Sequence, residues 1–119
     1  MRIQPDLKYN GYPCSYVATG TAVNRILGIE IDLPDGLHDD GYLSLKSENK
    51  YIRSLLPIKK YDYYKRGERP KLKELLKNNQ RKAVICVYGH LLYADKNNYY
   101  SFFDNDEDEV VAVWWIKEG

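Results

Sequence analysis

Residues 82–103 read "KAVICVYGHLLYADKNNYYSFF", and this stretch decides the fold class. Its β-branched and aromatic side chains form three short runs, "KAVICVYGH", "HLLYAD" and "NYYSFF", the last two separated by the turn residues "DKNN". Such runs are typical of β-strands. A fourth run, "EVVAVWWI", follows the acidic segment "DNDEDE". The four runs predict an antiparallel meander near the C-terminus.

The preceding residues show helical spacing instead. Pro13 suits the first position of a helix, because its missing N–H needs no partner there, and Gly28 suits the residue that ends it. A second helix follows the candidate N-cap Ser44, Pro70 opens a short third helix, and residues 57–70 are ambiguous. The apolar positions that share a face in the first two helices are Cys14, Ala18, Ala22 and Ile26, and then Leu45, Ile52, Leu55 and Leu56. Helices before strands predict an α+β fold, with N-terminal helices packed on a C-terminal antiparallel β-sheet.

Length and composition favour one small domain without a strong electric field. The chain has 119 residues, a formal net charge of +1 and 29% charged residues. Overall charge therefore favours neither nucleic acid, an anionic membrane nor an acidic partner. No apolar run approaches the ~20 residues of a membrane-spanning helix, and the N-terminus has no hydrophobic signal region. We expect a cytoplasmic protein that binds no membrane and keeps its two cysteines as free thiols.

Cys14 is the residue best placed for chemistry. It follows Pro13 at the start of the first predicted helix, where exposed N–H groups and the positive end of the helix dipole stabilise a thiolate. Acyl transfer by a thiolate also needs a proton carrier, a group that orients this carrier, and donors for the oxyanion. Cys86 is the opposite case. It lies inside the apolar run "VICVY", and we expect an inert core thiol there.

Two strand ends offer the proton carrier and its orienting group. His90 ends an apolar strand that would hold the imidazole rigidly. If the strands on either side of "DKNN" pair as a hairpin, Asp104 lies at the same end of that hairpin as His90. Asp104, or its neighbours Asn105 and Asp106, could then accept a hydrogen bond from the imidazole and fix its tautomer.

Gln4 completes the candidate set, because its amide could donate to an oxyanion together with the N–H of Cys14. Four features follow one another along the chain, which are a glutamine, a cysteine that opens a buried helix, "LKELLKNNQRKAVICVYGH" and then "YYSFFD". In the order of these features the chain resembles the papain-like cysteine peptidases, specifically the small bacteriocin-processing (C39-like) branch. The resemblance implies a single papain-like domain over residues 1–119. It also implies that Cys14 is the nucleophile, His90 the base and acid, Asp104 the orienting group and Gln4 the oxyanion donor.

The chain departs from the family pattern in three places. Gln4 lies further from the cysteine than in family members, which leaves Asn10 as a substitute donor. Ser15 stands where a glycine commonly follows the nucleophile, and this changes how closely a substrate approaches. No transmembrane or nucleotide-binding region follows, so we do not expect a leader peptidase coupled to a transporter.

No metal or organic cofactor is expected. Asp104, Asp106 and Asp108 imitate the start of a calcium-binding loop, but the glycine position of such a loop holds Glu109. The cysteines and histidines lack the paired spacing of a zinc site, and His38 is expected to be a solvated loop residue. The predicted chemistry is therefore hydrolysis of a peptide or isopeptide bond by a Cys-His-Asp triad, with acyl transfer to another amine as a variant. The expected partner is a peptide or protein substrate.

Two other classes of function remain open at this stage. In the first, the papain-like fold is a catalytically silent binding or inhibitor module. In the second, a small α+β domain binds nucleic acid through residues 59–82, where ten Lys or Arg interleave with tyrosines, as in single-strand binding surfaces. The same basic stretch could dock an acidic protein. The sequence does not indicate an oligomeric state.

Overall fold

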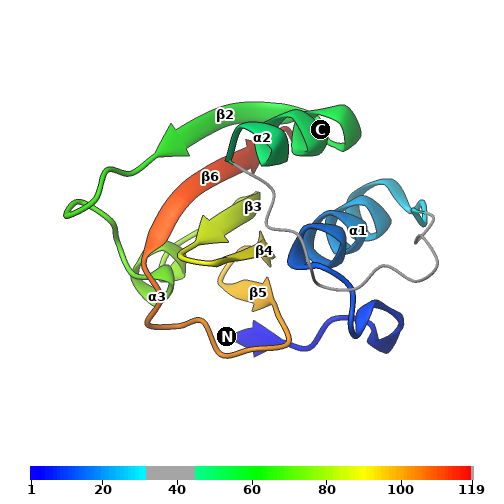
Figure 1. The fold of residues 1–119 in the computed structure, drawn as a ribbon, viewed down its shortest axis with the longest axis horizontal. Coiled ribbons are helices and arrows are strands. Elements are labelled where there is room, and N and C mark those ends of the chain that lie inside the picture. The colour runs from blue at the N-terminus through cyan, green and yellow to red at the C-terminus, as the bar shows by residue number, and fades with distance from the viewer. Residues whose placement is uncertain (32–44, 119) are drawn as a thin grey trace.

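The computed structural model describes residues 1–31 and 45–118, so the predictions for His38 and Ser44 lie outside the described residues. The described residues form a six-stranded mixed sheet in the order β1-β5-β4-β3-β6-β2, with helices on both faces (Figure 1). Neighbouring strands are antiparallel except β1 and β5, which are parallel. The strands are β1 (Arg2–Ile3), β2 (Ile58–Tyr63), β3 (Lys82–Val87), β4 (His90–Asp95), β5 (Asn98–Tyr100) and β6 (Val110–Ile116).

The α+β class is confirmed, but the sheet is not built from the C-terminal half alone. β1 and β2 form its two edges, and β2 lies in the ambiguous residues 57–70. The predicted meander is wrong for β6, which pairs with β3 and not with β5. β6 is buried along nearly its whole length, so its backbone needs a hydrogen-bonding neighbour on both edges. β3 and β2 supply these neighbours. The acidic segment before β6 connects β5 to β6, past β4 and β3 in the sheet.

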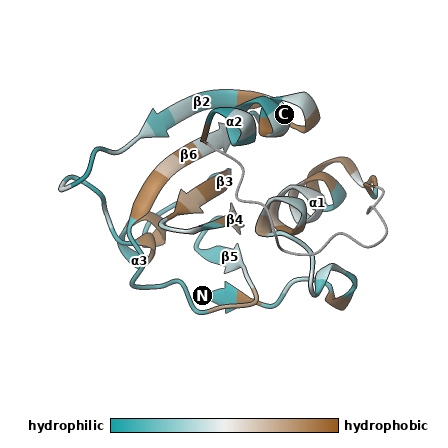
Figure 2. Ribbon diagram, in the orientation of Figure 1, coloured by the Kyte–Doolittle hydropathy of each residue, from teal (hydrophilic) through white to brown (hydrophobic). Residues whose placement is uncertain are grey.

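Two helices cover one face of the sheet and a third packs on the other. α1 (Cys14–Leu27) and α2 (Leu45–Leu55) share one apolar cluster with the sheet, and the five-residue α3 (Leu72–Leu76) belongs to the opposite cluster. Figure 2 shows the apolar strands β3 and β6 between these layers. Gly28 ends α1 as predicted, with a left-handed φ of 69°. Pro13 is the N-cap, one residue earlier than predicted, so Cys14 is the first helical residue.

α2 is fixed over the sheet by contacts at both of its sides. Trp114 of β6 is fully buried, and its indole N–H donates to Asn49 Oδ1 of α2 over 2.9 Å. Tyr51 of α2 meets Tyr16 of α1 edge to face, with ring centroids 5.8 Å apart. These contacts hold the first turn of α2 beside the start of α1, where the candidate nucleophile lies.

Gly20, in the middle of α1, allows the ring of Tyr9 to pack against the helix backbone. A Cβ atom at this position would lie 2.7 Å from both the Cε1 and the hydroxyl of Tyr9, which is 2% exposed. We expect Gly20→Ala to lower the free energy of unfolding by about 1–2 kcal/mol, because overpacking outweighs the ~1 kcal/mol that alanine gains in helix propensity. Urea unfolding measures this change.

A double-mutant cycle with Tyr9→Ala provides the control for Gly20→Ala. Once the ring of Tyr9 is removed, the same substitution should become neutral or stabilising. A destabilisation by Gly20→Ala that is equally large without the ring would show that the close packing of Tyr9 is not the reason for glycine here.

Candidate active site

Cys14 lies at the N-terminus of a helix long enough to have a developed dipole. The first N–H groups of a helix point out of its N-terminus, and in α1 the first intrahelical bonds come from Tyr16 and Val17 to the carbonyl of Pro13. Cys14 is half-buried and lines two surface clefts. This end of α1 therefore favours a thiolate at Cys14 and offers backbone donors to an oxyanion beside it.

His90 is the first residue of β4, directly after a two-residue turn. Val87 pairs with His90 across this turn, and Gly89 adopts a φ of 77° that favours glycine. Gly89 therefore makes this tight turn before His90 possible. The β3–β4 hairpin, paired with β6 and β5, holds the His90 backbone rigidly.

The structure brings Cys14 and His90 to the same groove. Two adjoining clefts share four lining residues, which are Cys14, Tyr88, Gly89 and His90. The first, here named the α2 cleft, has a volume of about 300 Å³ and is also lined by Leu45, Glu48, Tyr63, Arg69, Cys86, Val87 and Val111. The second, named the Phe103 cleft, has a volume of about 330 Å³ and is also lined by Tyr12, Val17, Phe102, Phe103, Asn105 and Asp108. A peptide that follows both clefts would pass the Cys14 sulfur and the His90 ring.

A chain of buried polar groups orients the His90 ring. Nε2 of His90 lies 3.1 Å from the hydroxyl oxygen of Ser101, which donates its proton to Asn105 Oδ1 over 2.6 Å. Asn105 in turn donates to Asp108 over 2.7 Å. A hydroxyl has one proton, so the Ser101 oxygen accepts from His90, and this network assigns the ring proton to Nε2. Nδ1 is then the basic nitrogen of the neutral ring. The ring of Phe103 packs edge-on against the imidazole at 5.8 Å.

Asp104 lies near this chain but is held by other groups. Its carboxylate accepts from the Tyr99 hydroxyl at 3.3 Å and from the N–H of Asp106 at 3.0 Å, and its side chain is exposed. Asp106 also accepts from Tyr99, over 2.6 Å. Of the three neighbours considered from the sequence, Asn105 is therefore the one that reaches His90, through Ser101. Sequence reasoning missed Ser101, although a single small polar residue inside the aromatic run "YYSFF" was a signal for it.

Gln4 is not brought to the groove. Ile3 pairs with Tyr100 at the edge of the sheet, and this pairing directs Gln4 to a separate cleft beside the second half of α1. Asn10, the substitute donor, is exposed and lines neither the α2 cleft nor the Phe103 cleft. Among the described residues, the backbone N–H groups at the start of α1 remain as candidate oxyanion donors.

Cys86 differs from Cys14 in its electrostatic surroundings, although both thiols line the α2 cleft. Burial raises the pKa of the Cys86 thiol to about 12, and the negative charge of Glu48 adds to this shift. Its sulfur lies 3.5 Å from the carbonyl oxygen of Val87. Cys86 is thus a neutral thiol at physiological pH, but it is half-buried in the wall of the cleft and not in the core as predicted.

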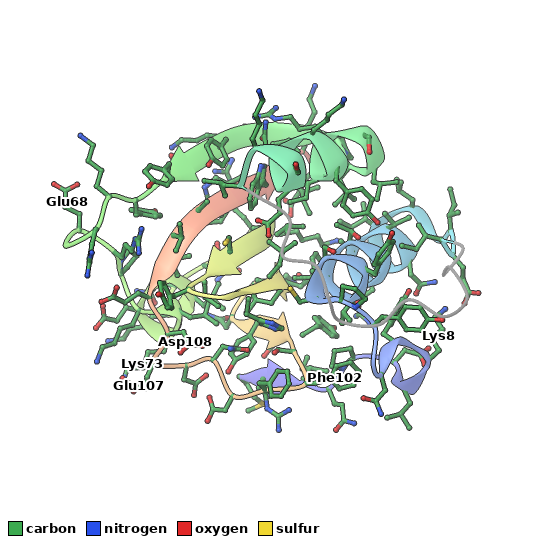
Figure 3. The ribbon with its side chains drawn as sticks, viewed as in Figure 1. Lys8, Glu68, Lys73, Phe102, Glu107 and Asp108 are labelled. Carbon is green, nitrogen blue, oxygen red and sulfur yellow. The ribbon has the colours of Figure 1, made fainter. Side chains whose placement is uncertain are left out.

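The basic stretch at residues 59–82 is spread over β2, a loop, α3 and the start of β3. Lys71 and Lys73 both form ion pairs with Glu107, and these two ammonium groups lower the pKa of the Glu107 carboxyl to about 2. Figure 3 labels Lys73 and Glu107 of this group. Arg81 stacks over Trp115. The interleaved tyrosines Tyr61 and Tyr64 are partly buried against the two apolar clusters. Much of the stretch is thus engaged within the fold.

Comparisons with protein-family models, with curated protein sequences and with solved structures find no significant match for this chain. In the part of the chain that the structure describes, no helix is long and apolar enough to span a bilayer. Across the same residues, no group of three or more histidine, cysteine or acidic side chains is arranged to hold a metal ion. The centre of the candidate site is formed by Cys14 and His90.

Proposed function

We propose that this protein is a papain-like cysteine hydrolase that cleaves a peptide or isopeptide bond. One observation carries the proposal: Cys14, at the N-terminus of α1, and His90, at the start of β4, line the same two adjoining clefts. These residues are 76 positions apart in the sequence, and folding places both on one open groove. A thiol at a helix N-terminus beside an oriented imidazole is the arrangement that acyl transfer by cysteine requires.

In the proposed reaction, Nδ1 of His90 takes the proton of the Cys14 thiol, and the thiolate attacks the carbonyl carbon of the substrate. Backbone N–H groups at the start of α1 stabilise the oxyanion of the tetrahedral intermediate. The C–N bond then breaks, and the imidazolium returns its proton to the departing amine. Water, deprotonated by His90, attacks the thioester and releases the carboxylic acid and the thiol.

Ser101 and Asn105 act in this scheme as positioning residues. The Ser101 hydroxyl accepts from Nε2 and so keeps the basic nitrogen of His90 at Nδ1. Asn105 holds the hydroxyl in that orientation, because its amide nitrogen is occupied by Asp108 and its oxygen must face Ser101. A neutral serine in place of a carboxylate stabilises an imidazolium less strongly, since it offers no negative charge.

Thiol alkylation as a function of pH tests the proposal directly. With iodoacetamide, Cys14 should react with a midpoint well below the ordinary thiol pKa of ~8.5, because the helix N-terminus and His90 stabilise the thiolate. His90→Ala should raise this midpoint, whereas Cys86→Ser should leave it unchanged. Peptide mapping after alkylation identifies the labelled residue.

If Cys14 alkylates slowly with an ordinary midpoint in the folded protein, and His90→Ala has no effect, the hydrolase proposal is wrong. The groove would then fit better with a catalytically silent binding module. A salt-dependent shift of a single-stranded oligonucleotide, lost when Lys59, Lys60, Lys65 and Arg66 are neutralised, would instead favour nucleic-acid binding.

A further inference from the structure

Glu48 is a carboxylate with an unusual position in the α2 cleft. It lies in the first turn of α2, half-buried, in a cleft whose walls are otherwise formed largely by apolar and aromatic side chains such as Leu45, Tyr63 and Val111. Among the residues that the structure describes, no Lys, Arg or His nitrogen lies within ion-pair distance of Glu48. Burial raises the pKa of this carboxyl above its usual value. Within the described residues, the groove therefore holds an acidic group with which no cation forms an ion pair.

The neighbours of Glu48 keep it in this cleft. The Cys86 thiol lies close enough that each group shifts the pKa of the other, and because burial keeps Cys86 neutral, it acts as a weak donor toward the carboxylate and brings no competing charge. Asn49, the next residue of α2, is bonded to the buried Trp114 indole. The helix turn that carries Glu48 is thus fixed to the core.

We propose that Glu48 gives the groove its substrate specificity, by binding a lysine or arginine side chain on the α2 side of the bond that Cys14 attacks. This inference rests on the proposed function, since it names the class of peptide that the hydrolase accepts. The substrate is an extended peptide with a basic residue near the scissile bond. Its cationic group enters the α2 cleft and forms with Glu48 the ion pair that no described residue forms.

The other residues of the α2 cleft suit such a side chain. The aliphatic stem of a lysine or arginine can lie along Leu45 and Val111, and the ring of Tyr63, which is 51% exposed, offers a face to the cation. Arg69 is the only other fully charged group among the described lining residues, and its Nε donates to the Tyr64 carbonyl. The positive charge of Arg69 repels a basic side chain of the substrate. Such a side chain is therefore more stable beside Glu48 than beside Arg69.

Fluorogenic peptides that differ at a single position provide the first test. In matched series, lysine, glutamine or glutamate is placed in turn at each of three positions on either side of the cleaved bond. At one position, the wild-type protein should hydrolyse the lysine peptide with a kcat/KM about tenfold or more above that of the glutamine peptide, with the glutamate peptide slowest. Glu48→Gln should bring the lysine and glutamine peptides to nearly equal rates, and Glu48→Lys should reverse the order.

Glu74→Gln is the matched control, because Glu74 is an exposed carboxylate on α3 and the substitution makes the same change in net charge. This variant should retain the full preference for lysine. Because each preference is a ratio measured on one protein preparation, partial loss of folded protein does not change it. Equal hydrolysis of lysine, glutamine and glutamate peptides by the wild-type protein at every position would overturn the role of Glu48 while leaving the hydrolase in place.

A second measurement separates the two proposals if no peptide is cleaved. The cationic reagent 2-aminoethyl methanethiosulfonate and the anionic 2-sulfonatoethyl methanethiosulfonate both form a disulfide with a thiolate and release a sulfinate, without any hydrolase activity. The measured quantity is the rate of the cationic reagent at Cys14 divided by the rate of the anionic one. This ratio should be higher in the wild-type protein than in Glu48→Gln. An unchanged ratio would overturn the inference, whereas failed hydrolysis with a changed ratio would overturn the hydrolase alone.

Discussion

Cys14→Ala should abolish peptide hydrolysis, with a fall in kcat/KM of at least about 1,000-fold, while Cys86→Ser should retain most of the activity. The two thiols line the same cleft, so this pair of variants compares two sulfur atoms of one site that differ in their surroundings. Cys14 lies at a helix N-terminus that favours the thiolate, whereas burial raises the pKa of Cys86 to about 12. Loss of a nucleophile removes the covalent route entirely. Steady-state hydrolysis of a fluorogenic peptide measures both effects.

Mass spectrometry provides the control for this comparison. A peptide ester mixed with the wild-type protein and quenched in acid should leave an acyl group on the tryptic peptide that contains Cys14, and none on the peptide that contains Cys86. Both variants should keep the thermal unfolding midpoint within a few degrees of the wild type, since serine and alanine remove little volume at these half-buried positions. Activity that survives Cys14→Ala but is lost in Cys86→Ser would identify Cys86 as the nucleophile and contradict the proposed mechanism.

Signals confined to a few neighbouring residues predicted much of the local structure. Pro13 and Gly28 mark the ends of α1 because each has backbone properties that suit one position of a helix and few others. The two strands on either side of Tyr88 and Gly89 are also found, but the first ends at Val87 and not at His90 as predicted, because His90 follows the turn and begins β4. A cysteine in the first turn of a helix and a histidine at a strand end follow from these same local signals.

The parts that could not be predicted depend on pairing between distant segments. A two-residue strand such as β1 has no periodicity, so nothing in the sequence indicates that Ile3 pairs with Tyr100 and carries Gln4 away from the groove. β6 lies beside β3 because both faces of β6 are buried. This burial becomes evident only when β2 is known to pair with the other edge of β6. Ser101 was overlooked for a similar reason: its role depends on which way the hairpin turns its side chain, and a single run of letters does not give this direction.

Asp104 shows how a prediction can find the right region of a site and still miss the residue that contacts the imidazole of His90. The hairpin register pairs Tyr93 with Tyr100, so the residues after β5 do return to the level of His90, as expected. The side chain at position 104 is nevertheless held by the Tyr99 hydroxyl, and a buried serine contacts the imidazole instead. Register can be inferred from strand and turn lengths, whereas the choice among adjacent polar side chains depends on packing within about one ångström.

Ser101→Ala should therefore lower kcat/KM by about 10- to 100-fold, while Asp104→Ala should change it by less than about threefold. The Ser101 hydroxyl accepts from Nε2 of His90, and its loss removes the group that fixes the tautomer and orientation of the ring. The Asp104 carboxylate instead accepts hydrogen bonds from the Tyr99 hydroxyl and from the N–H of Asp106. The same peptide substrate, assayed from pH 5 to 9, gives both rates and the pH profile.

The pH profile and the imidazole tautomer distinguish positioning from a purely structural role of Ser101. At a pH high enough that the His90 ring is neutral, ¹⁵N chemical shifts of the wild-type protein should report the tautomer protonated at Nε2, and Ser101→Ala should show a mixture of tautomers together with a displaced limb of the rate profile. Asn105→Ala should cause a smaller change in the same direction, because it frees the Ser101 hydroxyl to rotate without removing it. A variant that loses activity in proportion to its loss of folded protein, with the tautomer and profile unchanged, would show that Ser101 supports the fold and does not orient the base. A large loss in Asp104→Ala with a small one in Ser101→Ala would instead restore the carboxylate as the orienting group.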